Sequence, residues 1–183
     1  LRVGLVFDVG GLGDKSFNDS AYEGLVRAQK KLGVSVTTLE PGDGDGRSAA
    51  LRMLASSGHA LIFGVGFIFT DDLLQMAADY PAVHFVGIDF AVRFDEHGQP
   101  LPLPANLCAL KFREEEGSYL AGALAALVSE THSLGFVGGM DIPLIHKFSA
   151  GFRQGAAAVC PSCTVRVLFA GLTPGAFKDP GRG

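Results

Sequence analysis

Side chains suited to recognising a small molecule follow the first apolar run of the chain. Asp8 comes directly after the run from Leu1 to Phe7, and Phe17 and Asn18 lie further along the same glycine-rich loop. A carboxylate accepts hydrogen bonds from hydroxyl groups, a phenyl ring stacks on a flat heterocycle, and a carboxamide both donates and accepts. These three residues are candidate ligand contacts, with a purely flexible turn as the alternative interpretation of the loop.

A second carboxylate, Asp89, comes directly after the expected strand from Val83 to Ile88. In a parallel sheet the carboxyl ends of the strands meet at one edge, where such sheets bind ligands. We therefore expect Asp8 and Asp89 to face the same crevice. An aspartate at a strand end can also serve only to close a turn, and this alternative stays open.

The glycines of the loop do not form a phosphate-binding motif. Counted from Gly11, the dinucleotide pattern finds Gly13 at its third position but Ser16 at its sixth. A Walker loop needs Gly-Lys-Ser/Thr, and Asp14 separates Gly13 from Lys15. The spacing therefore predicts no nucleotide cofactor.

Two patterns with catalytic or metal-binding potential have simpler interpretations. Cys160 and Cys163 form a C-x-x-C pair between an expected helix and an expected strand, whereas a redox pair normally opens a helix. A structural turn is favoured over a catalytic dithiol, a disulfide is left open, and no further zinc ligands stand at suitable spacing. Asp14 and Asp19 could hold a cation beside Asp8, but they equally suit a turn and a helix cap. We predict no metal and no catalytic residue.

The elements that must position these residues alternate between strand and helix. Apolar runs predict strands, and apolar residues recurring at helical spacing predict helices. The expected strands span residues 3–7, 34–39, 60–65 and 83–88, and the expected helices span 18–32, 47–57 and 70–79. This succession predicts an α/β fold with a doubly wound parallel sheet.

The first helix and the turn after the second strand carry more specific expectations. The helix is expected to begin near Asn18 or Asp19, capped by their side-chain oxygens, and to end at Gly33. The turn from Pro41 to Gly46 is acidic like a calcium loop but lacks the glutamate of such a loop, so a solvated loop is predicted. The buried face of the helix is expected to hold Tyr22, Leu25, Val26, Gln29 and Leu32.

Beyond residue 93 the pattern changes. Arg93 to Ala105 is rich in proline and charge and has no period, which predicts a surface excursion or linker. Glu114 is expected to open a long helix in which three solvated glutamates, Glu114 to Glu116, suit the helix dipole. The remaining expected elements are strands at 106–112, 133–137 and 164–169, a strand-end loop from Gly138 to Asp141, and a helix at 142–159.

Composition excludes several classes of partner. The 183 residues carry a formal net charge of -4, and their lysines and arginines are scattered, so nucleic acid is not an expected partner. The longest apolar stretch, Tyr119 to Val128, is far shorter than the ~20 residues of a membrane span. A hydrophobic content of 48% is enough for a sizeable core.

Three segments together closely resemble the basic membrane protein family, the substrate-binding proteins of ABC importers that include PnrA-like purine nucleoside receptors. They are residues 7–25 (FDVGGLGDKSFNDSAYEGL), 112–126 (FREEEGSYLAGALAA) and 134–155 (LGFVGGMDIPLIHKFSAGFRQG), in the order of the family. The resemblance implies a type I periplasmic-binding-protein-like fold, with an α/β lobe at 1–111 and an incomplete second α/β lobe at 112–183. Family members continue beyond Gly183, so a C-terminally truncated chain is expected.

The resemblance also implies a site. Similar receptors hold a purine nucleoside in a cleft between two lobes, with the base between aromatic rings and the ribose hydroxyls on carboxylates. Phe177 matches the second-lobe ring through a Phe-x-Asp-Pro pattern, in which Lys178 stands where the family commonly has Asn, and the carboxylate and lysine that complete the family site would lie beyond the chain. The first-lobe positions are matched by Asp8, Phe17, Asn18 and Asp89.

The function implied is a non-enzymatic receptor without a cofactor that presents its ligand to an ABC permease. Its location would be extracytoplasmic, in the periplasm or as a membrane-tethered lipoprotein. Two alternatives stay open. One is a nucleoside hydrolase that uses Asp8, Asp14 and Asp19 with a metal ion. The other is the ligand-sensing module of a regulator, and it is disfavoured because no helix-turn-helix precedes Leu1.

Overall fold

The computed structural model describes residues 1–41 and 46–182, and the contacts divide the chain into unit 1, Leu1–Lys111, and unit 2, Phe112–Gly183. Most of the acidic turn expected between Pro41 and Gly46 lies outside the described residues. Within the described part of the chain, no helix has both the length and the apolar character that crossing a bilayer requires.

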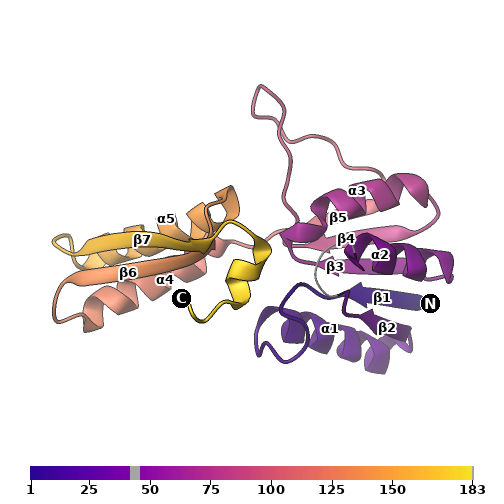
Figure 1. Cartoon of the computed structure of the whole chain (residues 1–183), viewed down its shortest axis with the longest axis horizontal. Coiled ribbons are helices and arrows are strands. Elements are labelled where there is room, and N and C mark those ends of the chain that lie inside the picture. The colour runs from indigo at the N-terminus through magenta and orange to yellow at the C-terminus, as the bar shows by residue number, and fades with distance from the viewer. Residues whose placement is uncertain (42–45, 183) are drawn as a thin grey trace. The chain divides into compact units, whose positions relative to one another are not determined.

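Unit 1 is built on a five-stranded sheet in the order β2-β1-β3-β4-β5, in which every neighbouring pair is parallel (Figure 1). The doubly wound parallel sheet expected from the alternating pattern is therefore confirmed. Because every neighbouring pair is parallel, the carboxyl ends of the strands lie at the same edge of the sheet. The strands are β1 (Arg2–Val6), β2 (Ser35–Leu39), β3 (Leu61–Val65), β4 (His84–Ile88) and β5 (Leu107–Leu110).

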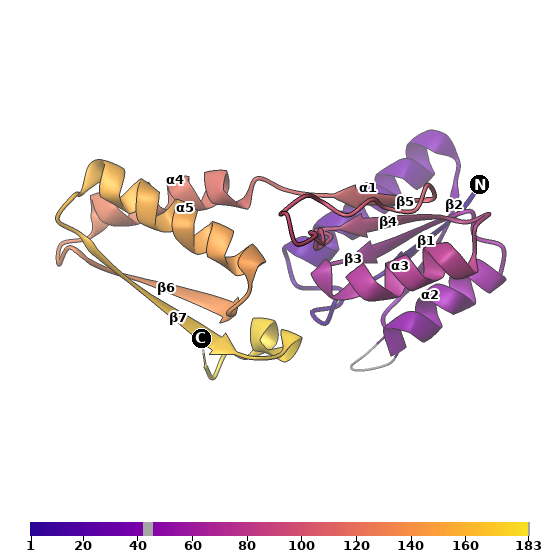
Figure 2. The same ribbon diagram turned by 90° about the horizontal axis from the view of Figure 1, so that it is seen from above.

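Helices cover both faces of this sheet. Figure 2 shows α1 (Phe17–Leu32) on one face and α2 (Gly46–Ser56) and α3 (Thr70–Asp79) on the other. A short 3-10 turn, η1 (Phe67–Phe69), joins β3 to α3. Side chains of β1 alternate between the two faces of the sheet. Val3, Leu5 and Phe7 pack in the hydrophobic cluster with α1, whereas Val6 packs in the cluster with α2 and α3.

The buried face of α1 differs from the expected one. Leu25 is buried, but Tyr22, Gln29 and Leu32 are exposed. Ala21 and Ala28 are instead partly buried and pack against the cluster that contains Leu25. The helix ends at Gly33 as expected, with a left-handed φ of 67° and its N–H donating to the carbonyl of Gln29.

The segment between β4 and β5 leaves unit 1 as a long projecting loop (Figure 1). Phe94 and Pro100 form an isolated antiparallel bridge, and the Asp95 carboxylate accepts hydrogen bonds from the amides of His97 and Gln99. The predicted surface excursion is thus confirmed. Asn106, at the end of the loop, anchors it to unit 1. Its Nδ2 donates hydrogen bonds to the backbone carbonyls of Ala77, Tyr80 and Val83.

Unit 2 has two parallel strands, β6 (Ser133–Met140) and β7 (Thr164–Gly171), and two helices, α4 (Glu114–Val128) and α5 (Pro143–Val159), on one face of them (Figure 2). The short 3-10 helix η2 (Pro174–Lys178) follows β7. The expected loop from Gly138 to Asp141 was wrong for its first three residues, because pairing with β7 keeps Gly138–Met140 extended. Glu114 also differs from the expected solvated residue: its side chain is 2% exposed and lies 3.0 Å from Nζ of Lys147.

Close packing of α4 on α5 explains two glycines of α5. A Cβ atom on Gly151 would lie 2.2 Å from the carbonyl oxygen of Glu115, and one on Gly155 would lie 1.9 Å from that of Tyr119. Only a hydrogen atom fits at either place. The hydroxyl of Ser118 adds a hydrogen bond of 2.6 Å to the carbonyl of Phe148 across the same interface.

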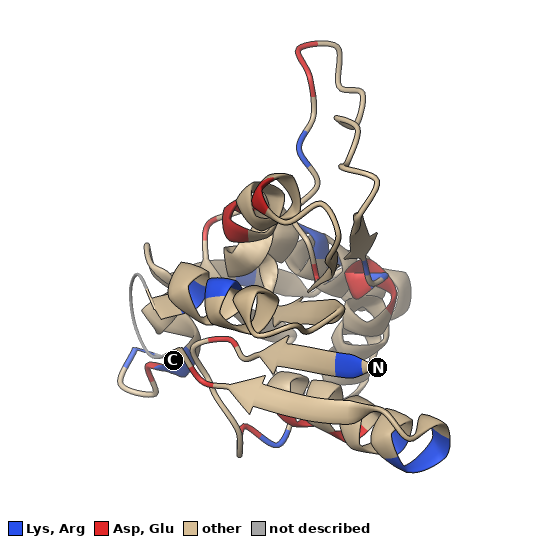
Figure 3. Cartoon of the chain, turned by 90° about the vertical axis from the view of Figure 1, so that its right-hand side faces the viewer, with Lys and Arg blue, Asp and Glu red and all other residues tan. Residues whose placement is uncertain are grey.

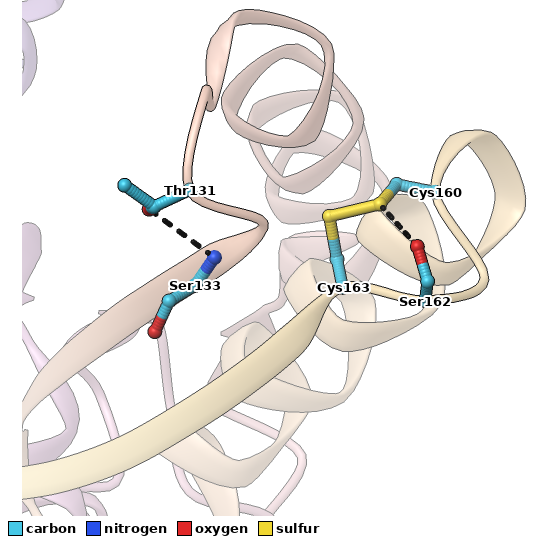
Figure 4. Close-up of a disulfide and its surroundings, with 5 residues drawn as sticks. All are labelled: Thr131, Ser133, Cys160, Ser162 and Cys163. Carbon is cyan, nitrogen blue, oxygen red and sulfur yellow. Dashed lines mark hydrogen bonds between the residues drawn. A yellow bond between two sulfur atoms is a disulfide. The ribbon is translucent and has the colours of Figure 1, made fainter.

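Cys160 and Cys163 are joined by a disulfide that closes the turn between α5 and β7, with their Cα atoms 5.3 Å apart (Figure 4). The N–H of Cys163 also donates to the carbonyl of Cys160 within this turn. Of the two interpretations of the C-x-x-C pair, the structure agrees with the structural turn.

Candidate functional site

The candidate site of unit 1 begins where β1 ends. The backbone N–H of Asp8 donates to Oδ1 of Asn18 at 2.9 Å, and the Asp8 carboxylate accepts a hydrogen bond from the N–H of Val9 at 2.6 Å. Asn18 is 2% exposed. The structure therefore brings Asp8 and Asn18 together. The Asn18 side chain fixes the backbone at the end of β1.

Asp14 supplies the capping hydrogen bonds of α1, although Ser16 occupies the N-cap position and its own side chain makes no capping hydrogen bond. The Asp14 carboxylate accepts hydrogen bonds from the backbone amides of Ser16 (2.9 Å), Asn18 (2.8 Å) and Asp19 (3.2 Å), and from Nδ2 of Asn18 (3.0 Å). The expected caps, Asn18 and Asp19, were therefore wrong, because the helix starts one residue earlier at Phe17. The sequence signal for capping by Asp14 was its position shortly before the expected start of the helix.

Asp19 organises the loop from the other side. Its Oδ1 accepts the N–H of Gly13 at 2.7 Å, and its Oδ2 accepts the N–H of Lys15 at 3.0 Å. The carboxylates of Asp14 and Asp19 are thus engaged by backbone amides. Across residues 1–41 and 46–182, the structure places no group of three or more His, Cys, Asp or Glu side chains where they could hold a metal ion.

Asp89 directly follows β4 and has a left-handed backbone, with φ of 60°. It is buried, with 9% of its surface exposed, and its Oδ1 lies 3.8 Å from Nζ of Lys111. Sequence reasoning missed Lys111. Its closeness to Asp89 depends on the strand register of the structure, in which β4 and β5 pair Ile88 with Leu110 and so make the next residues neighbours.

Gly66 lies between the two carboxylates. β3 separates β1 from β4 in the sheet, and the N–H of Gly66, directly after β3, donates to the carbonyl of Ile88 at 2.8 Å. Gly66 has φ of 101°, and a Cβ atom there would lie 2.4 Å from Oδ2 of Asp8. Asp8, Gly66 and Asp89 therefore follow three successive strands at one edge, and the glycine leaves room for the first carboxylate.

The environment shifts the two loop carboxyls in opposite directions. Burial raises the pKa of Asp8, the hydrogen bond from Val9 and the positive charge of Arg47 oppose the rise, and the charge of Asp14 adds to it. Burial alone would also raise the pKa of Asp14, but the hydrogen bonds from the three amides and from the Asn18 side chain together lower it.

The two predicted aromatic contacts lie in different units. Phe17 is the first residue of α1 and is partly buried against the cluster that contains Leu5 and Phe7. Phe177 belongs to η2 of unit 2, is 45% exposed, and lies against Gly139, where a Cβ atom would be 2.4 Å from its ring. A surface hollow of unit 2 includes Phe177, and its other lining residues include Val137, Ala170 and Pro180.

This arrangement suits a neutral ligand with hydroxyl groups. The edge of unit 1 offers two carboxylates as acceptors, and an aromatic ring stands at the start of the adjacent helix. Lys and Arg residues are spread over separate elements in Figure 3, and the formal net charge is -4, so the charge distribution does not favour a polyanion.

The chain matches a family model over residues 1–180, and the family is described as ABC transporter substrate-binding protein, PnrA-like. The ABC transporter nucleoside-binding protein BmpA of Lactococcus lactis is 30% identical over 187 residues, which cover 100% of this chain and 50% of that protein. An uncharacterized lipoprotein of Pyrococcus furiosus is 37% identical over 160 residues, covering 85% of this chain and 38% of that protein.

A solved structure supports the same relationship. The solute-binding protein of an ABC transporter system from Aeropyrum pernix K1 is 32% identical, with a TM-score of 0.78, over 92% of this chain and 46% of that chain. The expected type I periplasmic-binding-protein-like fold is thereby confirmed. This chain spans about half of the length of the curated relatives named above, or less.

Proposed function

The chain belongs to the PnrA-like family of ABC transporter substrate-binding proteins, and from this premise we propose that it binds a purine nucleoside and delivers it to a membrane permease. The observation that carries the proposal is the placement of Asp8 and Asp89 at one edge of a parallel sheet, next to the helix that begins with Phe17. Family membership supports a binding role, and these side chains support the choice of ligand.

Each residue has a proposed part. Asp8 and Asp89 accept hydrogen bonds from ribose hydroxyls, since a carboxylate forms strong, charge-assisted bonds with such donors. Phe17 stacks on the purine, a contact of about 0.5–1.5 kcal/mol beyond the buried area. Asn18 holds the backbone of Asp8, and a direct contact between Asn18 and the ligand stays a prediction. Stacking of Phe177 on the ligand also stays a prediction.

In this proposal the protein acts outside the cytoplasm and does not transform its ligand. The relative from Pyrococcus furiosus is named a lipoprotein, and family members are substrate-binding proteins of transporters. The engagement of Asp14 and Asp19 by backbone amides supports a receptor over a metal-dependent hydrolase that would use both carboxylates as ligands.

Isothermal titration calorimetry with adenosine, guanosine and inosine tests the proposal. We expect saturable binding of at least one of them, and weaker binding by the Asp89→Asn variant, with Asp95→Asn in the projecting loop as the matched control. Chromatography of the same mixtures should recover intact nucleoside. Absence of binding by all three ligands, or release of free base that is lost in the Asp8→Asn variant, would overturn the receptor assignment.

A further inference from the structure

We propose that Lys111 is a positioning residue of the ligand site, because its ammonium group holds the Asp89 carboxylate at the end of β4. This inference rests on the proposed function, since it concerns the same site. It adds a residue outside the set Asp8, Phe17, Asn18, Asp89 and Phe177.

The strand register fixes the two residues as neighbours. β4 and β5 pair as parallel strands with Ile88 opposite Leu110, so Asp89 and Lys111 are the next residues along each strand. The N–H of Phe90 donates to the carbonyl of Leu110 at 3.2 Å, which continues the pairing past the end of β4. The backbone therefore makes Lys111 and Asp89 neighbours and puts the ammonium group within reach of the carboxylate.

The Asp89 carboxylate lies where a nearby positive charge can stabilise it. The backbone φ of 60° at Asp89 is in the left-handed region, which aspartate tolerates better than most residues with a Cβ atom. Its side chain is 13% exposed, so most of the carboxylate is withdrawn from water. A carboxylate in that environment is stabilised by a nearby positive charge, and Nζ of Lys111 lies 3.8 Å from Oδ1.

The ion pair leaves room for a ligand. An ionised carboxylate has about four lone-pair sites, so a hydroxyl group can donate to Asp89 while Lys111 remains beside Oδ1. The Lys111 side chain is 33% exposed, so it reaches the carboxylate from the rim of unit 1. Lys111 therefore acts on the ligand through Asp89, and its effect should depend on the hydroxyl groups that Asp89 binds.

Binding measurements on variants separate this role from general charge or folding effects. Lys111→Met should weaken adenosine binding about tenfold, equivalent to about 1.4 kcal/mol. Lys111→Arg should retain most of the affinity. Lys30→Met, which removes an exposed positive charge from the last turn of α1, should leave it unchanged. With 2′,3′-dideoxyadenosine, which lacks the hydroxyls, Lys111→Met should bind as wild type does.

The double variant Lys111→Met with Asp89→Asn should bind adenosine about as weakly as Asp89→Asn alone, because the lysine acts through the carboxylate. Additive losses, equal losses for adenosine and the dideoxy analogue, or stronger adenosine binding by Lys111→Met would overturn the inference. In those cases wild-type binding would still support the proposed function.

A ligand-free crystal structure of the Lys111→Met variant tests the inference even if the wild type binds no nucleoside. We expect the Asp89 carboxylate to move while β4 and β5 keep their register. An Asp89 side chain and backbone unchanged from the wild type would overturn the role of Lys111, whatever the outcome of the binding experiments.

Discussion

Oδ1 of Asn18 accepts a hydrogen bond from the backbone N–H of Asp8 at 2.9 Å, and this bond joins the first turn of α1 to the end of β1. The same side chain donates from Nδ2 to Asp14 at 3.0 Å. One buried carboxamide thus links the strand that carries a proposed ligand contact to the residue that caps the helix.

Replacing Asn18 by alanine should lower the free energy of unfolding by about 1–3 kcal/mol, because it leaves the partly buried Asp8 amide without its acceptor. Urea denaturation followed by circular dichroism measures this loss. The control is Gln29→Ala, which removes an exposed carboxamide from the same helix and should change stability by less than about 0.5 kcal/mol. Equal effects of the two substitutions would argue against the linking role.

Asp8→Asn should stabilise the protein at neutral pH while it weakens nucleoside binding. The pKa of Asp8 is raised in the folded state, so stability is greatest while the carboxyl is protonated and falls as pH rises through the folded pKa. Asparagine avoids this loss and keeps an oxygen for the Val9 amide. Denaturation at pH 7 and pH 3 should show the variant more stable than wild type only at pH 7. A variant less stable at pH 7 would contradict the assignment.

Asp14→Asn should have the opposite pH dependence. The pKa of Asp14 is lowered in the folded state, so its contribution to stability is present above the ordinary pKa and is lost as pH falls through the folded pKa. At pH 7 the variant should lose about 0.3–1 kcal/mol, the range for a negative charge near a helix N-terminus, because asparagine can keep the hydrogen bonds but not the charge. The difference from wild type should shrink as the pH is lowered toward 3, and a difference that stays constant would refute the charged cap.

Gly66→Ala should damage both folding and binding. The new methyl group would lie 2.4 Å from Oδ2 of Asp8, and φ is 101°. Gly98→Ala is a matched control, because Gly98 also has a positive φ of 73° but its Cβ atom would meet nothing within 4 Å. The control should lose only the backbone cost of about 1–2 kcal/mol and keep full affinity in calorimetry. Similar affinities for both variants would contradict the proposed closeness of Gly66 to the site.

The strands of unit 1 and the positions of their terminal aspartates could be predicted because they depend on local pattern. The runs before Asp8 and Asp89 are apolar and end at a charge, so the strand ends were visible in the sequence. The side chain that caps α1 was not predicted correctly, because the choice between Asp14 and Asn18 depends on where the loop returns after β1.

Contacts between distant segments were the other source of error. Gly138 and Gly139 resemble a loop in the sequence, and only pairing with β7 makes them part of a strand. Glu114 was expected in solvent because the lysine beside it, Lys147, comes from α5. Lys111 was missed for a related reason: its neighbour Asp89 belongs to another strand, and the register between strands cannot be read from either segment alone.

The central claim is that the carboxyl edge of the unit 1 sheet binds a purine nucleoside. A crystal structure of the protein grown with adenosine tests it most directly. The account predicts a purine ring stacked on Phe17 and ribose hydroxyls within hydrogen-bond distance of the Asp8 or Asp89 carboxylate. Adenosine bound away from these residues, or stacked on Phe17 with neither carboxylate contacting the ribose, would contradict it.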